Sequence, residues 1–75
     1  MVLGFVQNII AEKIGGVKPK SIQMDFSFVD DKRIDEEDFY DLLELIEEEM
    51  KMNLVDHAWR FHDVRQLVEY ISRQQ

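Results

Sequence analysis

Residues 35–50 read Asp-Glu-Glu-Asp-Phe-Tyr-Asp-Leu-Leu-Glu-Leu-Ile-Glu-Glu-Glu-Met, and this stretch decides the fold. Its apolar side chains recur every three or four residues, which is the period of an α-helix with one buried face. Asp35 occupies the position of an N-cap residue, and Asp38 follows at the position of its capping-box partner. The stretch therefore predicts an amphipathic helix with a buried stripe formed by Phe39, Leu42, Leu43, Ile46 and Met50.

The opposite face of the predicted helix is acidic. Its carboxylates repeat at the same helical spacing as the apolar stripe, so they point away from the side that is buried. Such a face suits a basic protein surface, and the alternative is that it only keeps a small domain in solution. The residues of this face are Glu37, Asp41, Glu44 and Glu48, with Tyr40 and Leu45 beside them.

The net charge of −7 is concentrated in one part of the 75-residue chain. Residues 30–49 hold eleven of the sixteen acidic residues and only two basic ones, which gives this segment a charge of −9. We expect no binding to nucleic acid or to an anionic membrane, because both need a basic surface. The sequence has no cysteine, no apolar run of membrane-spanning length and no recognisable signal peptide. We therefore expect a single cytoplasmic domain over residues 1–75, present as a monomer.

A second amphipathic helix is predicted at the start of the chain, over residues 2–14. Residues 15–16 are both glycine and end it, because glycine readily adopts the left-handed conformation of a helix C-cap. Residues 17–34 lose helical periodicity, and residues 24–29 alternate like a β-strand for which no partner strand is evident. We expect a long loop here that covers the core with its aromatic side chains. The predicted buried face of the first helix consists of Val2, Val6, Ile9, Ile10 and Ile14.

The C-terminal third of the chain predicts one short and one longer helix. Residues 55–61 suit one or two helical turns capped by Asp56 or Asn53. Asp63 then caps a last helix over residues 64–72, after which we expect the tail to fray. The complete pattern is an all-α bundle of three main helices with a short helix before the last one. The buried face of the last helix is predicted to be Val64, Leu67, Val68 and Ile71.

No pattern in the sequence is typical of an enzyme or of a metal site. His57 and His62 are five residues apart, and no cysteine accompanies them, so we expect both to be surface or partly packed residues. Residues 33–39 are similar to the second half of an EF-hand. However, Val29 and Lys32 stand where a calcium loop needs an oxygen ligand and a glycine. We expect Trp59 in the core, with a role as an interface anchor as the alternative.

Several segments resemble the acyl carrier protein family, whose small domains carry 4′-phosphopantetheine. Residues 27–31, Ser-Phe-Val-Asp-Asp, are similar to the segment that precedes the attachment site in that family. Residues 42–50 resemble its second helix, and residues 61–64 with 67–71 resemble its final loop and helix. The resemblance covers nearly the whole chain. It implies that the second helix is the recognition surface, that the partner offers arginines and lysines, and that the function relates to fatty acid or polyketide biosynthesis.

The sequence departs from this family at the attachment site. The family carries an Asp-Ser-Leu motif at the start of the second helix, and its serine is esterified with phosphopantetheine. A gapless alignment places Asp35, Glu36 and Glu37 at these three positions. A carboxylate has no hydroxyl that could accept the phosphoryl group. We therefore expect no phosphopantetheine at Glu36 and no other cofactor or metal.

Three functional hypotheses follow. The preferred one is a non-catalytic, carrier-like interaction module that binds a basic partner, such as a carrier-dependent enzyme. The second is a working acyl carrier with phosphopantetheine at a non-standard site, for which the remaining serines are Ser21, Ser27 and Ser72. The third is a calcium-responsive helical module. In the preferred hypothesis the partner-binding residues are Glu37, Asp41, Glu44, Leu45 and Glu48.

Overall fold

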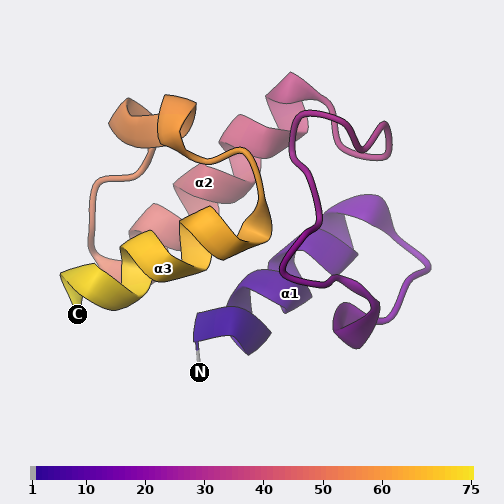
Figure 1. Cartoon of the computed structure of the whole chain (residues 1–75), viewed down its shortest axis with the longest axis horizontal. Coiled ribbons are helices and arrows are strands. Elements are labelled where there is room, and N and C mark those ends of the chain that lie inside the picture. Colours follow the sequence, from indigo (N-terminus) through magenta and orange to yellow (C-terminus); the bar gives the residue numbers. More distant parts are fainter. Residues whose placement is uncertain (1) are drawn as a thin grey trace.

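Three α-helices and two short 3₁₀ helices make up residues 2–75, the part of the chain that the computed structural model describes (Figure 1). Apart from one antiparallel bridge between Ser27 and Asp63, this part of the chain contains no β-structure. The all-α prediction is confirmed, with its three main helices, its short helix before the last one and its long first loop. In chain order the elements are α1 (Val2–Ile14), η1 (Pro19–Ser21), α2 (Glu36–Met50), η2 (Val55–Arg60) and α3 (Val64–Gln74).

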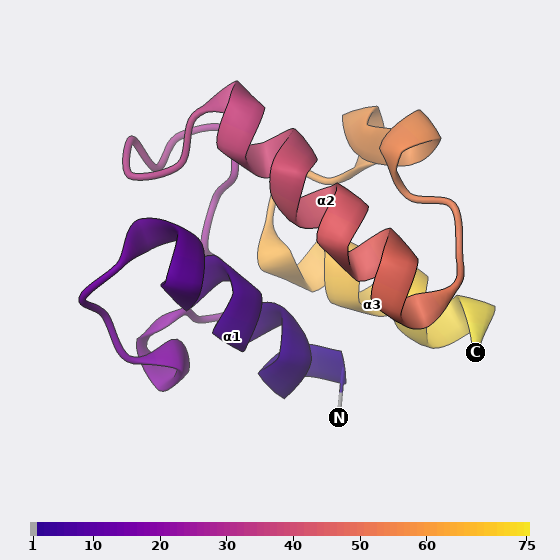
Figure 2. The same cartoon turned by 180° about the vertical axis from the view of Figure 1, so that it is seen from behind.

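Helix α1 packs against both α2 and α3, and η2 packs against α2 (Figures 1 and 2). The two views show that the 15–35 loop runs along one side of the bundle, between the ends of α1 and α2. Within residues 2–75 no helix is both long enough and apolar enough to cross a membrane.

The apolar stripe of α2 lies at the centre of the core. Phe39, Leu42, Leu43 and Ile46 are buried as predicted, and Met50 is partly buried at the end of the stripe. Removing one such aliphatic side chain from water contributes about 1.5–3 kcal/mol. The neighbouring helices supply the rest of the layer, and the predicted face of α3 is buried. On α1 the prediction holds in part, because Val2, Ile9 and Ile14 are only partly buried and Ala11 is buried in addition to Val6 and Ile10. Buried on α1 are Val6, Ile10 and Ala11, and on α3 Val64, Leu67, Val68 and Ile71.

The 15–35 loop is held by its backbone as well as by its side chains. Phe28 N donates to His62 O at 2.9 Å, Val64 N donates to Phe26 O at 3.0 Å, and Arg65 N donates to Met24 O at 2.9 Å. The strand-like alternation of residues 24–29 therefore has a partner after all, which is the segment that leads into α3. Ile22, Phe26, Phe28 and Ile34 of this loop are buried.

Side-chain caps fix the starts of α2 and α3. Asp35 Oδ1 accepts a hydrogen bond from Asp38 N at 2.8 Å, and Asp63 Oδ1 accepts one from Gln66 N at 2.9 Å. Both predicted N-caps are confirmed. The predicted end of the last helix is wrong, because α3 continues through Gln74, where Arg73 suits the negative end of the helix dipole.

The predicted cap of the short helix is also wrong. The N-cap position of η2 is Leu54, which has no polar side chain, and the Asn53 amide binds Asp56 Oδ2 at 3.0 Å. Glu47, near the end of α2, takes the capping role from outside η2. Its Oε2 accepts hydrogen bonds from Leu54 N at 2.6 Å and from Val55 N at 2.7 Å.

Replacing Glu47 by alanine is expected to lower the free energy of unfolding by about 2 kcal/mol. The substitution removes a charged acceptor from two partly buried backbone N–H groups, which then lack a partner. Glu48→Ala is the matched control, because Glu48 is exposed on the same helix, and its effect is expected to stay within about 0.5 kcal/mol. Urea denaturation followed by circular dichroism measures both. Equal stability of the two variants would show that Glu47 does not anchor η2.

Lys51 ends α2 in the left-handed conformation, with φ at 57°, and its backbone N–H donates to Glu47 O. A side chain in this conformation is strained, whereas glycine is not. Lys51→Gly is therefore expected to stabilise the fold by about 1 kcal/mol. Lys51→Ala keeps the strain and serves as the control. Thermal denaturation of the two variants tests this, and an unchanged or lower melting temperature for Lys51→Gly would refute it.

Candidate functional site

The predicted acidic face of α2 lies on the surface. Its residues Glu37, Asp41, Glu44 and Glu48 are all exposed, on the side of the helix opposite the buried stripe. Lys13 of α1 pairs with one of them, because its Nζ lies 3.2 Å from Asp41 Oδ2. Within residues 2–75, the other three carboxylates, Glu37, Glu44 and Glu48, form no ion pair. The carboxylates available to a partner are therefore Glu37, Glu44 and Glu48.

Each edge of the acidic face carries an apolar side chain. A helix turns by about 100° per residue, so Leu45 lies beside Asp41, on the edge toward α1, and Tyr40 lies on the opposite edge. The Leu45 side chain is 50% exposed and that of Tyr40 is 41% exposed. Leu45 was predicted to contribute to binding, and the structure places it beside the carboxylates as predicted. The two edges differ in their surroundings, because Tyr40 lines a hollow that Leu45 does not reach.

This α2–η2 hollow lies between the first turns of α2, the 3₁₀ helix η2 and the 28–34 part of the loop, and it has a volume of about 380 Å³. Its floor is aromatic, with the Phe28 and Phe39 rings 4.9 Å apart between their centroids. Asp35, Glu36 and His62 supply its polar rim. The other lining residues are Val29, Ile34, Tyr40, Ala58, Trp59 and Phe61.

Trp59 corrects the sequence analysis, because it is 71% exposed rather than part of the core. In a 3₁₀ helix the residues at i and i+3 share one side. Val55, Ala58 and Phe61 have this spacing and face the core, which turns the indole of Trp59 outward. The Arg60 guanidinium stacks over the indole, 5.2 Å from its centroid. The spacing of three between the apolar residues of segment 55–61 is the sequence signal that would have predicted the exposure of Trp59.

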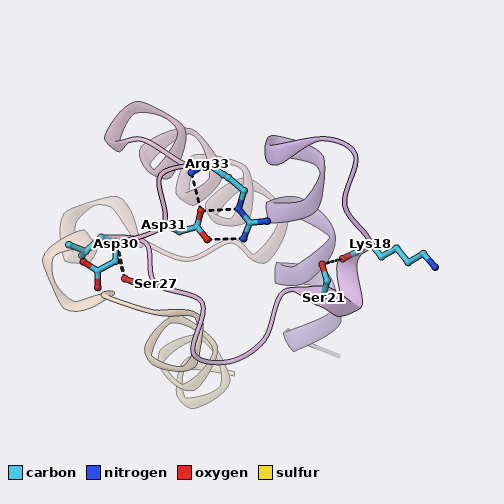
Figure 3. Close-up of polar contacts among 7 residues, drawn as sticks. Lys18, Ser21, Ser27, Asp30, Asp31 and Arg33 are labelled. Atoms are coloured by element: carbon cyan, nitrogen blue, oxygen red, sulfur yellow. Dashed lines mark hydrogen bonds and ion pairs between the residues drawn. The ribbon is translucent and has the colours of Figure 1, made fainter.

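Glu36 is the first residue of α2 and borders the hollow, so the position that resembles the attachment site holds an exposed carboxylate. The three serines lie elsewhere. Ser27 Oγ accepts hydrogen bonds from Asp30 N at 2.9 Å and from Val29 N at 3.2 Å, and Ser21 Oγ donates to Lys18 O at 2.6 Å (Figure 3). Ser72 is exposed on α3. Both loop hydroxyls thus stabilise turns.

An ion pair between Asp31 and Arg33 closes the turn that leads into the segment that resembles half of an EF-hand. Arg33 Nη2 lies 2.7 Å from Asp31 Oδ2, while Arg33 Nε and the Arg33 backbone N both donate to Asp31 Oδ1 (Figure 3). Within residues 2–75 no three histidine, cysteine, aspartate or glutamate residues lie close enough together to hold a metal ion. Hydrogen bonds from the Arg33 side chain and backbone lower the pKa of Asp31 to about 2.

The effect of this ion pair on the Asp31 carboxyl can be measured by titration. Because the pKa of Asp31 is lower in the folded protein than in the unfolded chain, the pair stabilises the fold above pH of about 4. Its contribution is lost as the pH falls from about 4 to about 2. Carboxyl NMR shifts should give a midpoint near 2 for Asp31, and Arg33→Ala should raise it toward 3.8. A midpoint that does not change in Arg33→Ala would contradict the assigned cause.

In a scan against models of protein families, no model matches the chain. The relation to acyl carrier proteins therefore rests on the sequence segments described above and stays a prediction.

Proposed function

We propose that the protein is a non-catalytic interaction module, similar to an acyl carrier protein without its phosphopantetheine, that binds a basic protein surface through α2. The observation that carries this proposal is the arrangement of Glu37, Glu44 and Glu48. All three are exposed and free of ion pairs within residues 2–75, and they stand on one face of a helix whose other face is fixed in the core.

Charge is what selects the partner in this proposal. The −9 charge of residues 30–49 attracts a basic surface over a distance of about 10 Å at moderate ionic strength. Short-range affinity then comes from desolvated apolar contacts beside the charges, and Leu45 offers such a contact on α2 itself. Asp41 contributes less, because Lys13 already neutralises part of its charge. A partner of this kind is a carrier-dependent enzyme whose docking site presents arginines and lysines.

The structure favours binding over covalent carriage. The first turn of α2 already holds Glu36, Glu37 and Asp38, and these carboxylates occupy the positive end of the helix dipole where a phosphate would otherwise be stabilised. A phosphodiester placed there would be repelled by them. The module would therefore act as a non-covalent ligand of an enzyme or as a structural subunit.

A pair of charge reversals tests the acidic face. Glu44→Lys/Glu48→Lys should abolish retention of the basic partner from cells that express the protein. Glu12→Lys/Glu69→Lys is the matched control, because both of its glutamates are exposed on other helices and the change in net charge is identical. Far-UV circular dichroism should show unchanged helicity in both variants. Equal retention of the partner by the two variants would refute the assignment of this face.

Intact-mass analysis separates this proposal from the working-carrier alternative. The protein from its own cells, and the protein incubated with coenzyme A and a broad-specificity phosphopantetheinyl transferase, should both show the unmodified mass. Addition of one phosphopantetheine would instead make the protein a carrier with a displaced attachment residue. A Ser21, Ser27 and Ser72 series of alanine variants would then locate it.

A further inference from the structure

The exposed apolar side chains of this protein are not scattered. Among the described residues, four large apolar side chains are exposed, and three of them, Val29, Tyr40 and Trp59, surround the α2–η2 hollow. They come from three separate elements, the loop, α2 and η2, so the fold and not local sequence brings them together. Val29 is 67% exposed and Trp59 is 71% exposed, which leaves much apolar area in water at one place.

The hollow beneath them has the size and lining of a binding pocket for one bulky side chain. Its volume of about 380 Å³ is at the lower end of the range of small-ligand pockets. Phe28, Phe39 and Phe61 are already buried below it, so an entering group would meet an apolar floor rather than unpaired polar groups.

The charges around the hollow define the chemistry of its occupant. Asp35 and Glu36 line it together with His62, and no lysine or arginine does, while the Arg60 guanidinium nearby is stacked over the Trp59 indole. Asp35 is engaged as the N-cap of α2, whereas Glu36 makes no ion pair within residues 2–75. An anionic occupant, such as a phosphate or a free fatty acid, would meet these carboxylates at the mouth. A cationic segment would be attracted by them.

We propose that the α2–η2 hollow receives an aliphatic or aromatic side chain of the basic partner, and that lysines or arginines next to that side chain pair with Glu36 and Glu37. This inference rests on the proposed function and refines it, because it places the main apolar anchor of the interface at the edge of α2 toward η2, with Leu45 as a lesser contact on the other edge. Trp59 and Tyr40 then act as the main contacts, as such residues commonly do in interfaces.

Trp59 reports on this site directly, because it is the only tryptophan in the chain. The probe is a capped peptide with one leucine between two pairs of lysines. Its binding should move the fluorescence of Trp59 to shorter wavelength, as the indole leaves water. A peptide with serine in place of the leucine should bind at least tenfold more weakly, and a peptide with glutamates in place of the lysines should not bind.

Two variants decide between the two edges of the acidic face. Val29→Ser/Tyr40→Ala removes two contacts around the hollow and should weaken binding of the leucine–lysine peptide at least tenfold. Leu45→Ala removes the apolar contact of the other edge and should weaken binding of this peptide by a smaller factor than Val29→Ser/Tyr40→Ala does. Affinities are measured by ¹H–¹⁵N NMR titration of the full chain, and thermal denaturation verifies that each variant is folded.

The outcomes separate the inference from the proposed function. Loss of binding in Leu45→Ala, with no effect of Val29→Ser/Tyr40→Ala, would overturn the inference and leave the acidic face as the docking surface. The inference would likewise be overturned, and the acidic face kept as the docking surface, by a second result. In that result only Glu44→Lys/Glu48→Lys loses binding, and binding to the unchanged protein does not alter Trp59 fluorescence. Saturable binding of the glutamate peptide, or no binding of the leucine–lysine peptide at millimolar concentration, would overturn the inference as well.

Discussion

Burial of the α2 stripe is the constraint on which the rest of the structure depends. Leu42, Leu43 and Ile46 are fully buried, in contact with the apolar faces of the other helices. Because a helix has a fixed period, burying these residues leaves no freedom in where the remaining side chains of α2 point. The carboxylates at the other positions must face water. The acidic surface is thus a geometric consequence of the core, and any partner that recognises it recognises a rigid arrangement.

The loop and η2 depend on α2 through two different kinds of contact. Phe28 stacks with Phe39 at the start of α2, and the Glu47 carboxylate holds η2 at the other end of the helix. These contacts hold two segments that are far apart in the sequence against the two ends of α2. The α2–η2 hollow lies between these two segments and the first turns of α2.

The parts that could be predicted from the sequence are those governed by a single period or by a local cap. The buried faces of α2 and α3 and the caps Asp35 and Asp63 belong to this group. The capping of η2 by Glu47 could not be predicted, because it joins two elements through a turn whose path is set by tertiary packing. The exposure of Trp59 was missed for a related reason, since it depends on the 3₁₀ period of η2 rather than on hydrophobicity. The carboxylates of the candidate site were thus identified in advance, and the hollow beside them was not.

The electrostatics of the α2 N-terminus link the fold to the proposed interaction. The dipole of α2 favours negative charge at its first turn, and Glu36, Glu37 and Asp38 supply that charge from within the chain. A helix N-terminus without charged side chains is a natural site for phosphate, whereas the first turn of α2 already carries carboxylates. The same residues that stabilise the helix therefore disfavour an anionic group at its N-terminus and favour a cationic one, as the proposed interaction requires. Since Glu36 also borders the hollow, the charge that excludes a phosphate stands beside the apolar surface that would hold a partner's side chain. In the proposed interaction, preference for a basic partner and rejection of an anionic ligand would then have one physical cause, which is the composition of the first turn of α2.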